Sequence, residues 1–438
     1  MTYQINTYGC QMNAHDSEKI AGILEKNGFL EWDESSHQTK KADLIIFNTC
    51  CVRDHAEARV FGNIGALREA KENNPDMVIA VCGCMMQQEG MEQKISRRFP
   101  FVDIIFGTHN LDEFEKYIHE VIIEKKKIRQ IQEGMEIIED LPIKRAYNKS
   151  AYATIMYGCD NYCSYCIVPY VRGRERSRDM EAVVQEVRGL AKQGYVEITL
   201  LGQNVNSYGG NGNNASFPQL LRTLNEIDGL EFIRFMTSHP KDLSDELIEV
   251  MARCDKICKH IHLPVQSGSN RILTAMNRCY SREHYLSLIH KLRAQIPDIA
   301  VTTDIIVGFP GETEDDFEDT LRLMEQVRFT SAFTFMYSVR TGTKAADMQH
   351  QIDKKIKKQR LHRLNALQNQ IIQEDAPGYI NKTMRVMVDE VMNKKDEVKA
   401  KAENTKTVFL KGDPHMIGKV YEVKIKAARA GALVAEII

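Results

Sequence analysis

The first third of the chain alternates short apolar runs with longer amphipathic segments. Four apolar runs have the length of buried strands, at residues 4–8, 44–48, 77–81 and 102–106. A helical pattern follows each of them, beginning near His15, Asp54, Gln87 and Leu111. This alternation predicts an α/β fold with a parallel sheet and helices on its faces, in an N-terminal domain of residues 1–140.

The middle of the chain, residues 150–346, repeats the alternation six times. The strand-like runs lie at residues 152–157, 196–201, 232–236, 259–263, 300–307 and 332–337. Helical patterns separate them, for example at residues 180–192, 242–251, 281–294 and 314–327. Six such units predict an open or partial (β/α)6 barrel. Its active site would lie at the carboxyl ends of the strands.

The last part changes pattern. A lysine-rich helix at 353–375, within a basic connector of residues 347–375, precedes a C-terminal domain of residues 376–438. Short β patterns occur there at residues 384–388, 407–410, 419–425 and 433–437. A segment of this size predicts a small β-barrel of the OB type, which often reads nucleic acid.

Charge distribution adds to this picture. The 438-residue chain has a net charge of only −2, but residues 351–438 carry 18 Lys and Arg against 11 Asp and Glu. The C-terminal segment is therefore at +7 and the remainder at −9. A basic segment on an acidic body suggests a polyanionic partner, and a solvated basic surface explains the charge equally well. Without an apolar run of roughly 18 residues or the features of a signal peptide, we expect a cytoplasmic protein with no membrane contact.

Three cysteines carry the sharpest chemical signal. Cys159, Cys163 and Cys166 follow the first strand of the predicted barrel. A 4Fe-4S cluster needs four ligands, and this motif supplies three, which leaves one iron open to a small molecule. The amine and carboxylate of S-adenosylmethionine (SAM) can occupy that position, and electron transfer would then cleave the sulfonium. The alternative is a structural zinc site, which usually pairs two cysteine knuckles; a second knuckle is not present nearby.

A second set of cysteines is dispersed. Cys10, Cys50 and Cys84 each come just after one of the N-terminal strands, so the topology brings them to one edge of the sheet. Isolated cysteines often only fill a core, so metal binding and packing are both open on spacing alone. We interpret the neighbouring Cys51 and Cys82 as spare, because a turn at a strand end is expected to aim only one of two neighbours inward.

Several short sequence motifs together resemble those of a known family. They are NTYGCQMNAHDSE at 6–18, NTC at 48–50 with Arg53, CGCM at 82–85, CIVPY at 166–170, RGRERSR at 172–178, GQNVNSYG at 202–209, TSHP at 237–240, HLPVQSGS at 262–269 and TDIIVGFPGE at 303–312. The chain resembles the radical SAM methylthiotransferase family of the MiaB type, and its last region looks like the RNA-binding TRAM domain. The resemblance implies a second 4Fe-4S cluster at Cys10, Cys50 and Cys84, and a Tyr165 ring packed on the SAM adenine.

The resemblance also implies a reaction, methylthiolation of carbon 2 of N6-dimethylallyladenosine next to the anticodon of tRNA. One SAM would methylate a sulfur on the N-terminal cluster, and a second would give the radical that takes hydrogen from the base. A flavodoxin- or ferredoxin-like electron donor is expected, and the sulfur donor stays open. Alternatives are the same chemistry on N6-threonylcarbamoyladenosine or a ribosomal-protein aspartate, and a non-catalytic RNA-binding iron–sulfur sensor.

Further candidate contacts lie at the barrel strand ends. Gln203, Ser238 and Gln266 are predicted to touch cofactor or base, and Asp304 joins the predicted cofactor contacts through its family word. Four arginines, Arg172, Arg174, Arg176 and Arg178, would grip phosphates or the cofactor carboxylate; the alternative is surface charge paired with Glu175.

His239 and His262 receive no role in this interpretation. Two segments depart from the family pattern. Residues 337–343 lack two prolines that are common there, and residues 399–411 hold Lys and Asn where a Gly-Arg-Thr word is expected.

Overall fold

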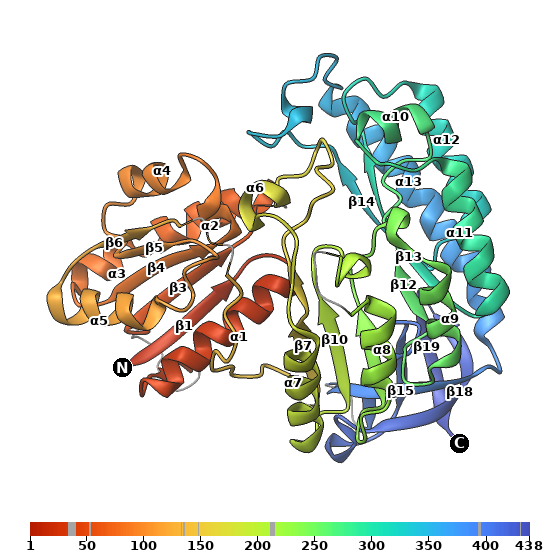
Figure 1. The fold of residues 1–438 in the computed structure, drawn as a ribbon, viewed down its shortest axis with the longest axis horizontal. Coiled ribbons are helices and arrows are strands. Elements are labelled where there is room, and N and C mark those ends of the chain that lie inside the picture. Colours follow the sequence, from red (N-terminus) through yellow and green to blue (C-terminus); the bar gives the residue numbers. More distant parts are fainter. Residues whose placement is uncertain are drawn as a thin grey trace. The chain divides into compact units, whose positions relative to one another are not determined.

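The computed structural model describes residues 1–33, 41–51, 54–132, 134, 136–147, 149–210, 215–392, 396–429 and 431–438 (Figure 1). The chain divides into two compact units. The first comprises Met1–Ala146, Tyr157–Asp160 and Ile167–Arg176, and the second comprises Tyr147–Met156, Asn161–Cys166 and Ser177–Ile438. Among the helices in these described ranges, none is long and apolar enough to cross a membrane.

The first unit is built on a six-stranded sheet in the order β2-β1-β3-β4-β5-β6, in which every pair is parallel. The strands are β1 Thr2–Thr7, β2 Leu30–Glu31, β3 Leu44–Thr49, β4 Val78–Gly83, β5 Ile104–Phe106 and β6 Ile128–Gln130. The helices are α1 Gln11–Lys26, α2 Asp54–Gly65, α3 Arg68–Asn73, α4 Met91–Arg98 and α5 Phe114–Glu124. The predicted parallel sheet is confirmed.

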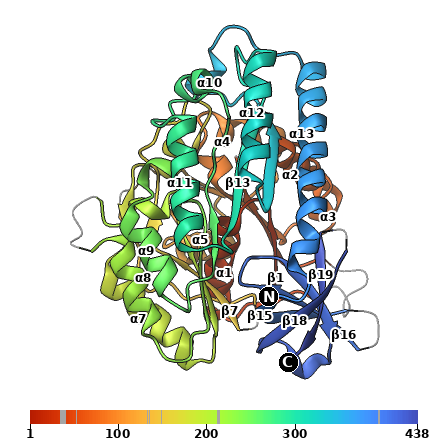
Figure 2. The ribbon, with the colours of Figure 1, turned by 90° about the vertical axis from the view of Figure 1, so that its right-hand side faces the viewer.

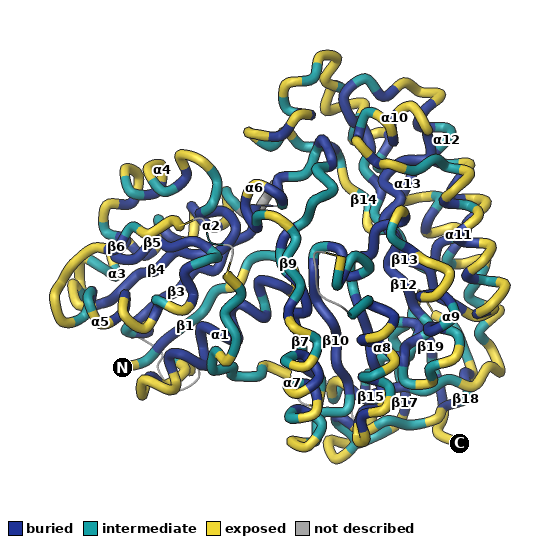
Figure 3. Tube along the Cα trace, viewed as in Figure 1, coloured by how far each residue is buried: buried dark blue, intermediate teal, exposed yellow. Residues whose placement is uncertain are grey.

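Helices cover both faces of this sheet. Ile20 of α1 and Phe114 of α5 pack on one face, and Ile64 of α2 and Ile95 of α4 pack on the other. Strands β3 and β4 are therefore buried along their whole length, as in Figure 3. Two-sided burial explains why these strands read as continuous apolar runs rather than as alternating ones.

Helix starts in the first unit differ from the prediction in two places. Helix α1 begins at Gln11, four residues before the expected start, directly after Cys10. After β4 the chain forms a short 3-10 helix, Cys84–Gln87, and α4 starts only at Met91. Both cysteines thus occupy turns that begin a helix.

The second unit contains the predicted half-barrel. Its strands are β7 Ser150–Thr154, β10 Glu197–Leu201, β11 Phe232–Phe235, β12 His260–His262, β13 Ala300–Val307 and β14 Ser331–Met336. They form two parallel sheets, β11-β10-β7 and β12-β13-β14, and a parallel bridge between Ile233 and Ile257 joins them. The helices are α7 Met180–Lys192, α8 Phe217–Asn225, α9 Asp245–Arg253, α10 Asn270–Ala275, α11 Arg282–Gln295, α12 Glu314–Val327 and α13 Lys354–Asp375.

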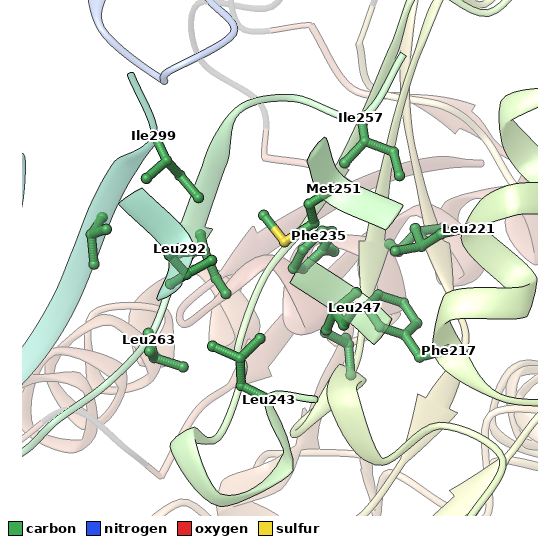
Figure 4. Close-up of a cluster of buried hydrophobic side chains, with 14 of the residues drawn as sticks. Phe217, Leu221, Phe235, Leu243, Leu247, Met251, Ile257, Leu263, Leu292 and Ile299 are labelled. Atoms are coloured by element: carbon green, nitrogen blue, oxygen red, sulfur yellow. The ribbon is translucent and has the colours of Figure 1, made fainter. Parts of the chain in front are cut away.

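The core of the half-barrel lies between its strands and its outer helices. Figure 4 shows Phe235 of β11 beside Phe217 of α8. Their ring centroids are 5.2 Å apart at 88°, an edge-to-face contact. Leu247 and Met251 of α9 are fully covered in the same cluster. This packing fixes the strands whose carboxyl ends carry the candidate residues. Two short strands cross from one unit to the other along the chain, β8 Met156–Tyr157 and β9 Arg176–Ser177, and the short helix α6 Val168–Arg172 belongs to the first unit.

A closed five-stranded barrel ends the second unit. Its strands are β15 Thr383–Val391, β16 Glu397–Ala402, β17 Thr407–Lys411, β18 Val420–Arg429 and β19 Ala432–Ile437, in the order β15-β16-β17-β19-β18. Strand β16 was not among the predicted strands, because its apolar positions are one valine and two alanines between charged residues. Val398, Ala400 and Ala402 nevertheless point into the barrel core, as period-two alternation requires.

The closed barrel is attached to the amino ends of the half-barrel strands. Helix α13 leads from the half-barrel to it, as Figure 2 shows. Arg234 of β11 donates to the carbonyls of Ala402 and Glu403 at 3.0 and 2.9 Å and pairs with Glu197 of β10. Phe232, at the start of β11, packs with Met387 of β15. The carboxyl ends of the strands, at the opposite edge, are not used by this attachment.

Candidate functional site

Three turns meet at the carboxyl edge of the sheet in the first unit. Cys10 follows β1, Cys50 follows β3 and Cys84 follows β4. A Cβ built on Gly9 would lie 2.8 Å from the Cys50 Cβ, and one built on Gly83 would collide with the Thr49 carbonyl. Both glycines also have positive φ values, so these positions need glycine for backbone and for space. The close packing of the turns places the three dispersed cysteines at one edge, as the topology predicted.

A buried arginine of α6 lies against one of these thiols. Arg172 donates from Nε to the Cys84 Sγ at 3.0 Å and from a terminal nitrogen to the Asp16 carboxylate at 2.7 Å. Arg172 and Asp16 are both nearly inaccessible to solvent. A hydrogen bond with Cys51 and the charge of Arg172 outweigh burial and lower the pKa of Cys84 to about 6. This thiol is therefore held in the state that binds metals.

The neighbouring thiols differ in their surroundings. Burial raises the pKa of Cys82 well above its ordinary value, and Cys82 packs into the helix-covered core. Cys50 and Cys51 are only 2% and 5% exposed, so the expectation that one of two neighbours faces inward is wrong. Strand β3 ends at Thr49, and beyond it the alternation of sides no longer applies. The choice of Cys50 over Cys51 stays a prediction, and Arg53 lies outside the described residues.

The three-cysteine motif spans the boundary between the units. Cys159 belongs to the first unit, where its amide donates to the Gly173 carbonyl at 3.2 Å. Cys163 and Cys166 belong to the second unit, where the Cys166 amide donates to the Cys163 carbonyl at 2.9 Å. Ser164 anchors this turn through its hydroxyl, which donates to the Ala275 carbonyl at 2.8 Å.

A second buried arginine lies against Cys163. Arg278 donates to the Cys163 Sγ at 3.4 Å, to the Pro264 carbonyl at 2.8 Å and to the Tyr280 hydroxyl at 3.0 Å. It is 6% exposed, and within the described part of the chain no carboxylate pairs with it. Sequence reasoning missed Arg278, because 115 residues separate it from Cys163 and its own segment has no motif that indicates a ligand contact.

The predicted cofactor contacts lie in the second unit, at or near the strand ends. Ser238 follows β11 and Gln266 follows β12, and the Ser238 Oγ and Gln266 Oε1 atoms are buried without a partner in the described structure. Gln266 also has a φ of 70°, a strained conformation for a residue with a side chain. Buried polar atoms are normally satisfied, so these two fit a polar ligand such as SAM.

The other predicted contacts have these neighbours. Tyr165 packs against a buried apolar cluster that includes Met276 and Phe309. Asp304 lies on β13, with its Oδ2 3.5 Å from His262 Nε2, and Gln203 follows β10 at intermediate exposure. His239 accepts from the Lys241 amide through Nδ1, and burial lowers its pKa to about 2, so it stays neutral. Their contacts with a cofactor stay a prediction.

The cysteine environments fit iron–sulfur clusters by their chemistry. Thiolates bear negative charge, and each set of cysteines has a buried guanidinium against one sulfur. Among the residues that the structure describes, however, no group of three or more Cys, His, Asp or Glu side chains is arranged to hold one metal ion. The ligand set Cys10, Cys50, Cys84, Cys159, Cys163 and Cys166 remains a prediction.

The four arginines after the motif separate into two kinds. Arg172 pairs with Asp16, and Arg178 pairs with Glu186 at 2.6 Å, and both arginines are buried. Because these two side chains are buried in ion pairs, the prediction that arginines of this segment bind RNA phosphates applies to Arg174 and Arg176. Arg174 pairs with Asp160 at 3.0 Å.

The segments that depart from the family pattern are ordered. Tyr337 packs edge-to-face on Phe309 with 5.6 Å between ring centroids, and Lys357 lies over its ring. This packing holds the start of the 337–343 turn without the two prolines. Residues 399–411 form most of β16 and β17, whose side chains alternate between barrel core and solvent.

Comparisons with known proteins agree with this architecture. Residues 2–107 match the family described as uncharacterized protein family UPF0004, residues 153–324 the radical SAM superfamily and residues 377–438 the TRAM domain. Among solved structures, the methyltransferase TsrM from Kitasatospora setae has a TM-score of 0.56 at 14% identity, covering 79% of this chain and 74% of that one. The cobalamin-dependent enzyme OxsB has a TM-score of 0.52 at 14% identity, covering 85% and 56%. These structures show the fold alone.

Curated relatives are much more similar. The tRNA-2-methylthio-N(6)-dimethylallyladenosine synthase of Clostridium perfringens is 52% identical over 438 residues, covering 99% of this chain and 97% of that protein. The protein of the same name from Thermoanaerobacter sp. (strain X514) is 50% identical, covering 100% and 92%. Identity of this extent over all three regions leaves one assignment. The chain belongs to the MiaB-type tRNA methylthiotransferases, enzymes of the radical SAM superfamily.

Proposed function

We propose that this enzyme methylthiolates carbon 2 of N6-dimethylallyladenosine next to the anticodon of tRNA, with two 4Fe-4S clusters and two SAM molecules. The observation that carries the proposal is the identity of 50–52%, over almost the whole chain, to relatives named for this reaction. The GCQMN motif around Cys10 is also typical of the MiaB type within the family.

Each set of cysteines would hold one cluster. Cys10, Cys50 and Cys84 would bind the first, and Cys159, Cys163 and Cys166 would bind the second. When bound with SAM, these groups supply the electron for SAM cleavage and the sulfur for transfer. Arg172 and Arg278 stabilise negative sulfur by charge-assisted hydrogen bonds, which are about twice as strong as neutral ones.

The half-barrel would bind SAM through its strand ends. The Gln266 Oε1 can accept a hydrogen bond from the SAM amine or adenine, and the Ser238 hydroxyl can donate one or accept one. Tyr165 would pack on the adenine, with Gln203 and Asp304 as further polar contacts. These groups would orient the cofactor and replace its hydration shell.

The C-terminal barrel would bind the tRNA. It matches the TRAM domain, and residues 351–438 carry the net charge of +7 that a phosphate backbone attracts. A flavodoxin- or ferredoxin-like protein would supply electrons. Because the substrate is tRNA, the proposal places the reaction in the cytoplasm.

The test is a product assay under anaerobic conditions. The reconstituted enzyme, SAM and a reductant are incubated separately with tRNA carrying dimethylallyladenosine, tRNA carrying threonylcarbamoyladenosine and the ribosomal protein. Mass spectrometry of the digests should find a methylthio group only on the dimethylallyl nucleoside. Product on another substrate would assign the enzyme to that branch. If no 5′-deoxyadenosine forms with any substrate, the iron–sulfur sensor becomes the better account.

A further inference from the structure

Strand β14 is an edge strand whose two faces differ in character. On one face, Ala332 and Met336 pack against the half-barrel core, and the Thr334 hydroxyl donates to Asn365 Oδ1 of α13 at 2.6 Å. On the other face, the rings of Phe333 and Phe335 are 51% and 43% exposed. Helix α13 therefore lies beside one face of the strand (Figure 1). The second face presents two neighbouring aromatic rings to solvent.

Two large exposed rings side by side on an edge strand need an explanation. Edge strands usually carry charged or small residues on their exposed positions, because apolar ones invite aggregation. Contiguous exposed apolar surface in a folded protein most often marks a binding site. Phe333 and Phe335 lie two residues apart on one strand, so their side chains share a face and form one surface.

Polar groups border this surface. In the sheet register, Asp304 of β13 is the direct neighbour of Phe333, and Ile306 is that of Phe335. The His262 ring lies edge-on to Phe333 with 5.8 Å between centroids, and its Nε2 is 3.5 Å from Asp304 Oδ2. Gln266, whose Oε1 is buried without a partner in the described structure, bridges to Ile305 of the same strand. A flat apolar surface thus lies next to hydrogen-bonding groups.

A purine base with an apolar substituent has the complementary chemistry. Its ring faces stack on aromatic side chains, its edge carries donors and acceptors, and an N6 dimethylallyl chain adds five carbons of apolar surface. We propose that Phe333 and Phe335 form the surface on which the target adenine and its dimethylallyl chain rest after the base leaves the anticodon-loop stack. This inference rests on the proposed function and assigns the substrate subsite to residues that the sequence words did not single out.

The experiment measures discrimination between two RNAs. Anticodon stem-loops that carry either dimethylallyladenosine or plain adenosine are titrated into the reconstituted full chain, and fluorescence anisotropy gives each Kd. Phe333→Ala and Phe335→Ala should each weaken binding of the dimethylallyl stem-loop by roughly 5- to 150-fold, the range of one lost base–aromatic stack. The preference for the dimethylallyl over the plain stem-loop should fall as well.

Two further variants separate stacking from general apolar contact and from nonspecific loss. Phe333→Leu keeps apolar area without the flat ring, so its affinity should lie between wild type and Phe333→Ala. Ile123→Ala, at an exposed apolar position on α5 of the first unit, should bind both RNAs as wild type does. Circular dichroism and iron content check that each variant is folded.

The outcomes distinguish this inference from the proposed function. If the phenylalanine variants bind the two RNAs with the wild-type preference, the inference is overturned and the proposed function stands. An equal loss of affinity for both RNAs also overturns it, since the rings would then make no contact with the dimethylallyl chain. If wild type modifies neither RNA in the product assay, the proposed function fails, and this inference fails with it.

Discussion

Two buried arginines lie against cysteine sulfurs, one in each unit, and their charges are balanced differently. Arg172 of the first unit bonds Cys84 and also pairs with the Asp16 carboxylate. Arg278 of the second unit bonds Cys163, but its other partners are a carbonyl and a hydroxyl. Among the described residues, Arg278 is thus a buried cation that no carboxylate neutralises.

The difference lies in which negative group neutralises each buried arginine. A buried cation is costly unless an anion lies close to it. Asp16 neutralises Arg172 whatever the state of Cys84, whereas Arg278 depends on negative charge at sulfur. An iron–sulfur cluster with three thiolate ligands supplies such charge, which is the strongest physical argument in the structure for a cluster beside Cys163.

The largest expected effect concerns Cys50 and Cys51, which are both buried and adjacent in sequence. Cys50→Ala should remove the N-terminal cluster, about four irons per chain, and Cys51→Ala should retain it. Each variant is the control for the other, since both remove one buried thiol. Iron and sulfide analysis after anaerobic reconstitution measures the difference. Loss of iron in Cys51→Ala alone would move the ligand assignment to Cys51.

Removal of Arg172 tests how much the buried Arg172–Asp16 ion pair stabilises the first unit. Arg172→Met leaves the Asp16 carboxylate buried without its cation, and should lower the free energy of unfolding of the first unit by about 3–5 kcal/mol. Trp32, the single tryptophan, lies in this unit and reports its unfolding in urea. The double variant Asp16→Leu/Arg172→Met removes both charges and should recover most of the loss. A double variant as unstable as the single one would show that packing, not charge, is responsible.

His260 differs from the two buried arginines, because burial keeps its side chain neutral. Burial, more than the neighbouring His262, Arg234 and Lys401, lowers its pKa from 6.5 to about 3. At pH above 6.5 the imidazole is neutral in the folded and the unfolded chain. As pH falls from 6.5 toward 3, only the unfolded chain takes up the proton, so stability is lost by about 1.4 kcal/mol per pH unit.

His260→Gln should reduce that slope by the same amount. Urea unfolding at several pH values, followed by circular dichroism, measures the slope, with Trp32 fluorescence identifying the first unit. An unchanged slope in the variant would mean that His260 is protonated in the folded protein.

The smallest effect on stability is expected for Arg278. In the cluster-free protein, Arg278→Met removes an uncompensated charge, and the Tyr280 hydroxyl still donates to the Pro264 carbonyl. The variant should therefore lose no more than about 1 kcal/mol of stability. In the cluster-loaded protein, loss of this cation should lower the reduction potential of the cluster, because the negative charge gained on reduction is then less stabilised. A tenfold shift in the one-electron equilibrium corresponds to about 59 mV.

Spectroelectrochemistry measures this potential. A cluster-free variant as unstable as Arg172→Met, or an unchanged potential, would break the proposed contrast between the two arginines.

Hydrophobic patterning predicted most strands of the three parallel sheets, because buried strands leave uninterrupted apolar runs. It missed β16, whose core positions include two alanines, and β2 and β6, which have two and three residues. It also placed the start of α1 too late, because Gln11, Met12 and Asn13 have no helical apolar pattern. Local pattern fails where a strand is short or its core residues are small.

The site was less predictable than the fold. The cysteines stand out by their spacing and by position after strands, but their neighbours do not. Arg172 and Cys84 are 88 residues apart, and Arg278 and Cys163 are 115 apart. Contacts over such separations depend on tertiary packing. The local sequence marked Arg172 only as one of four candidate phosphate or cofactor contacts, and it did not mark Arg278. The strand at residues 332–337 was predicted, but the pattern did not show that Phe333 and Phe335 are exposed.

The proposed reaction depends most on two independent clusters, which anaerobic iron and sulfide analysis with Mössbauer spectra tests directly. The intact chain is compared with two matched triple variants, Cys10/Cys50/Cys84→Ala and Cys159/Cys163/Cys166→Ala. If each set of cysteines holds its own cluster, the intact chain binds about eight irons and each variant about four. About four irons in the intact chain and none in the Cys159/Cys163/Cys166 variant would contradict it, and would leave a radical SAM enzyme without the second cluster.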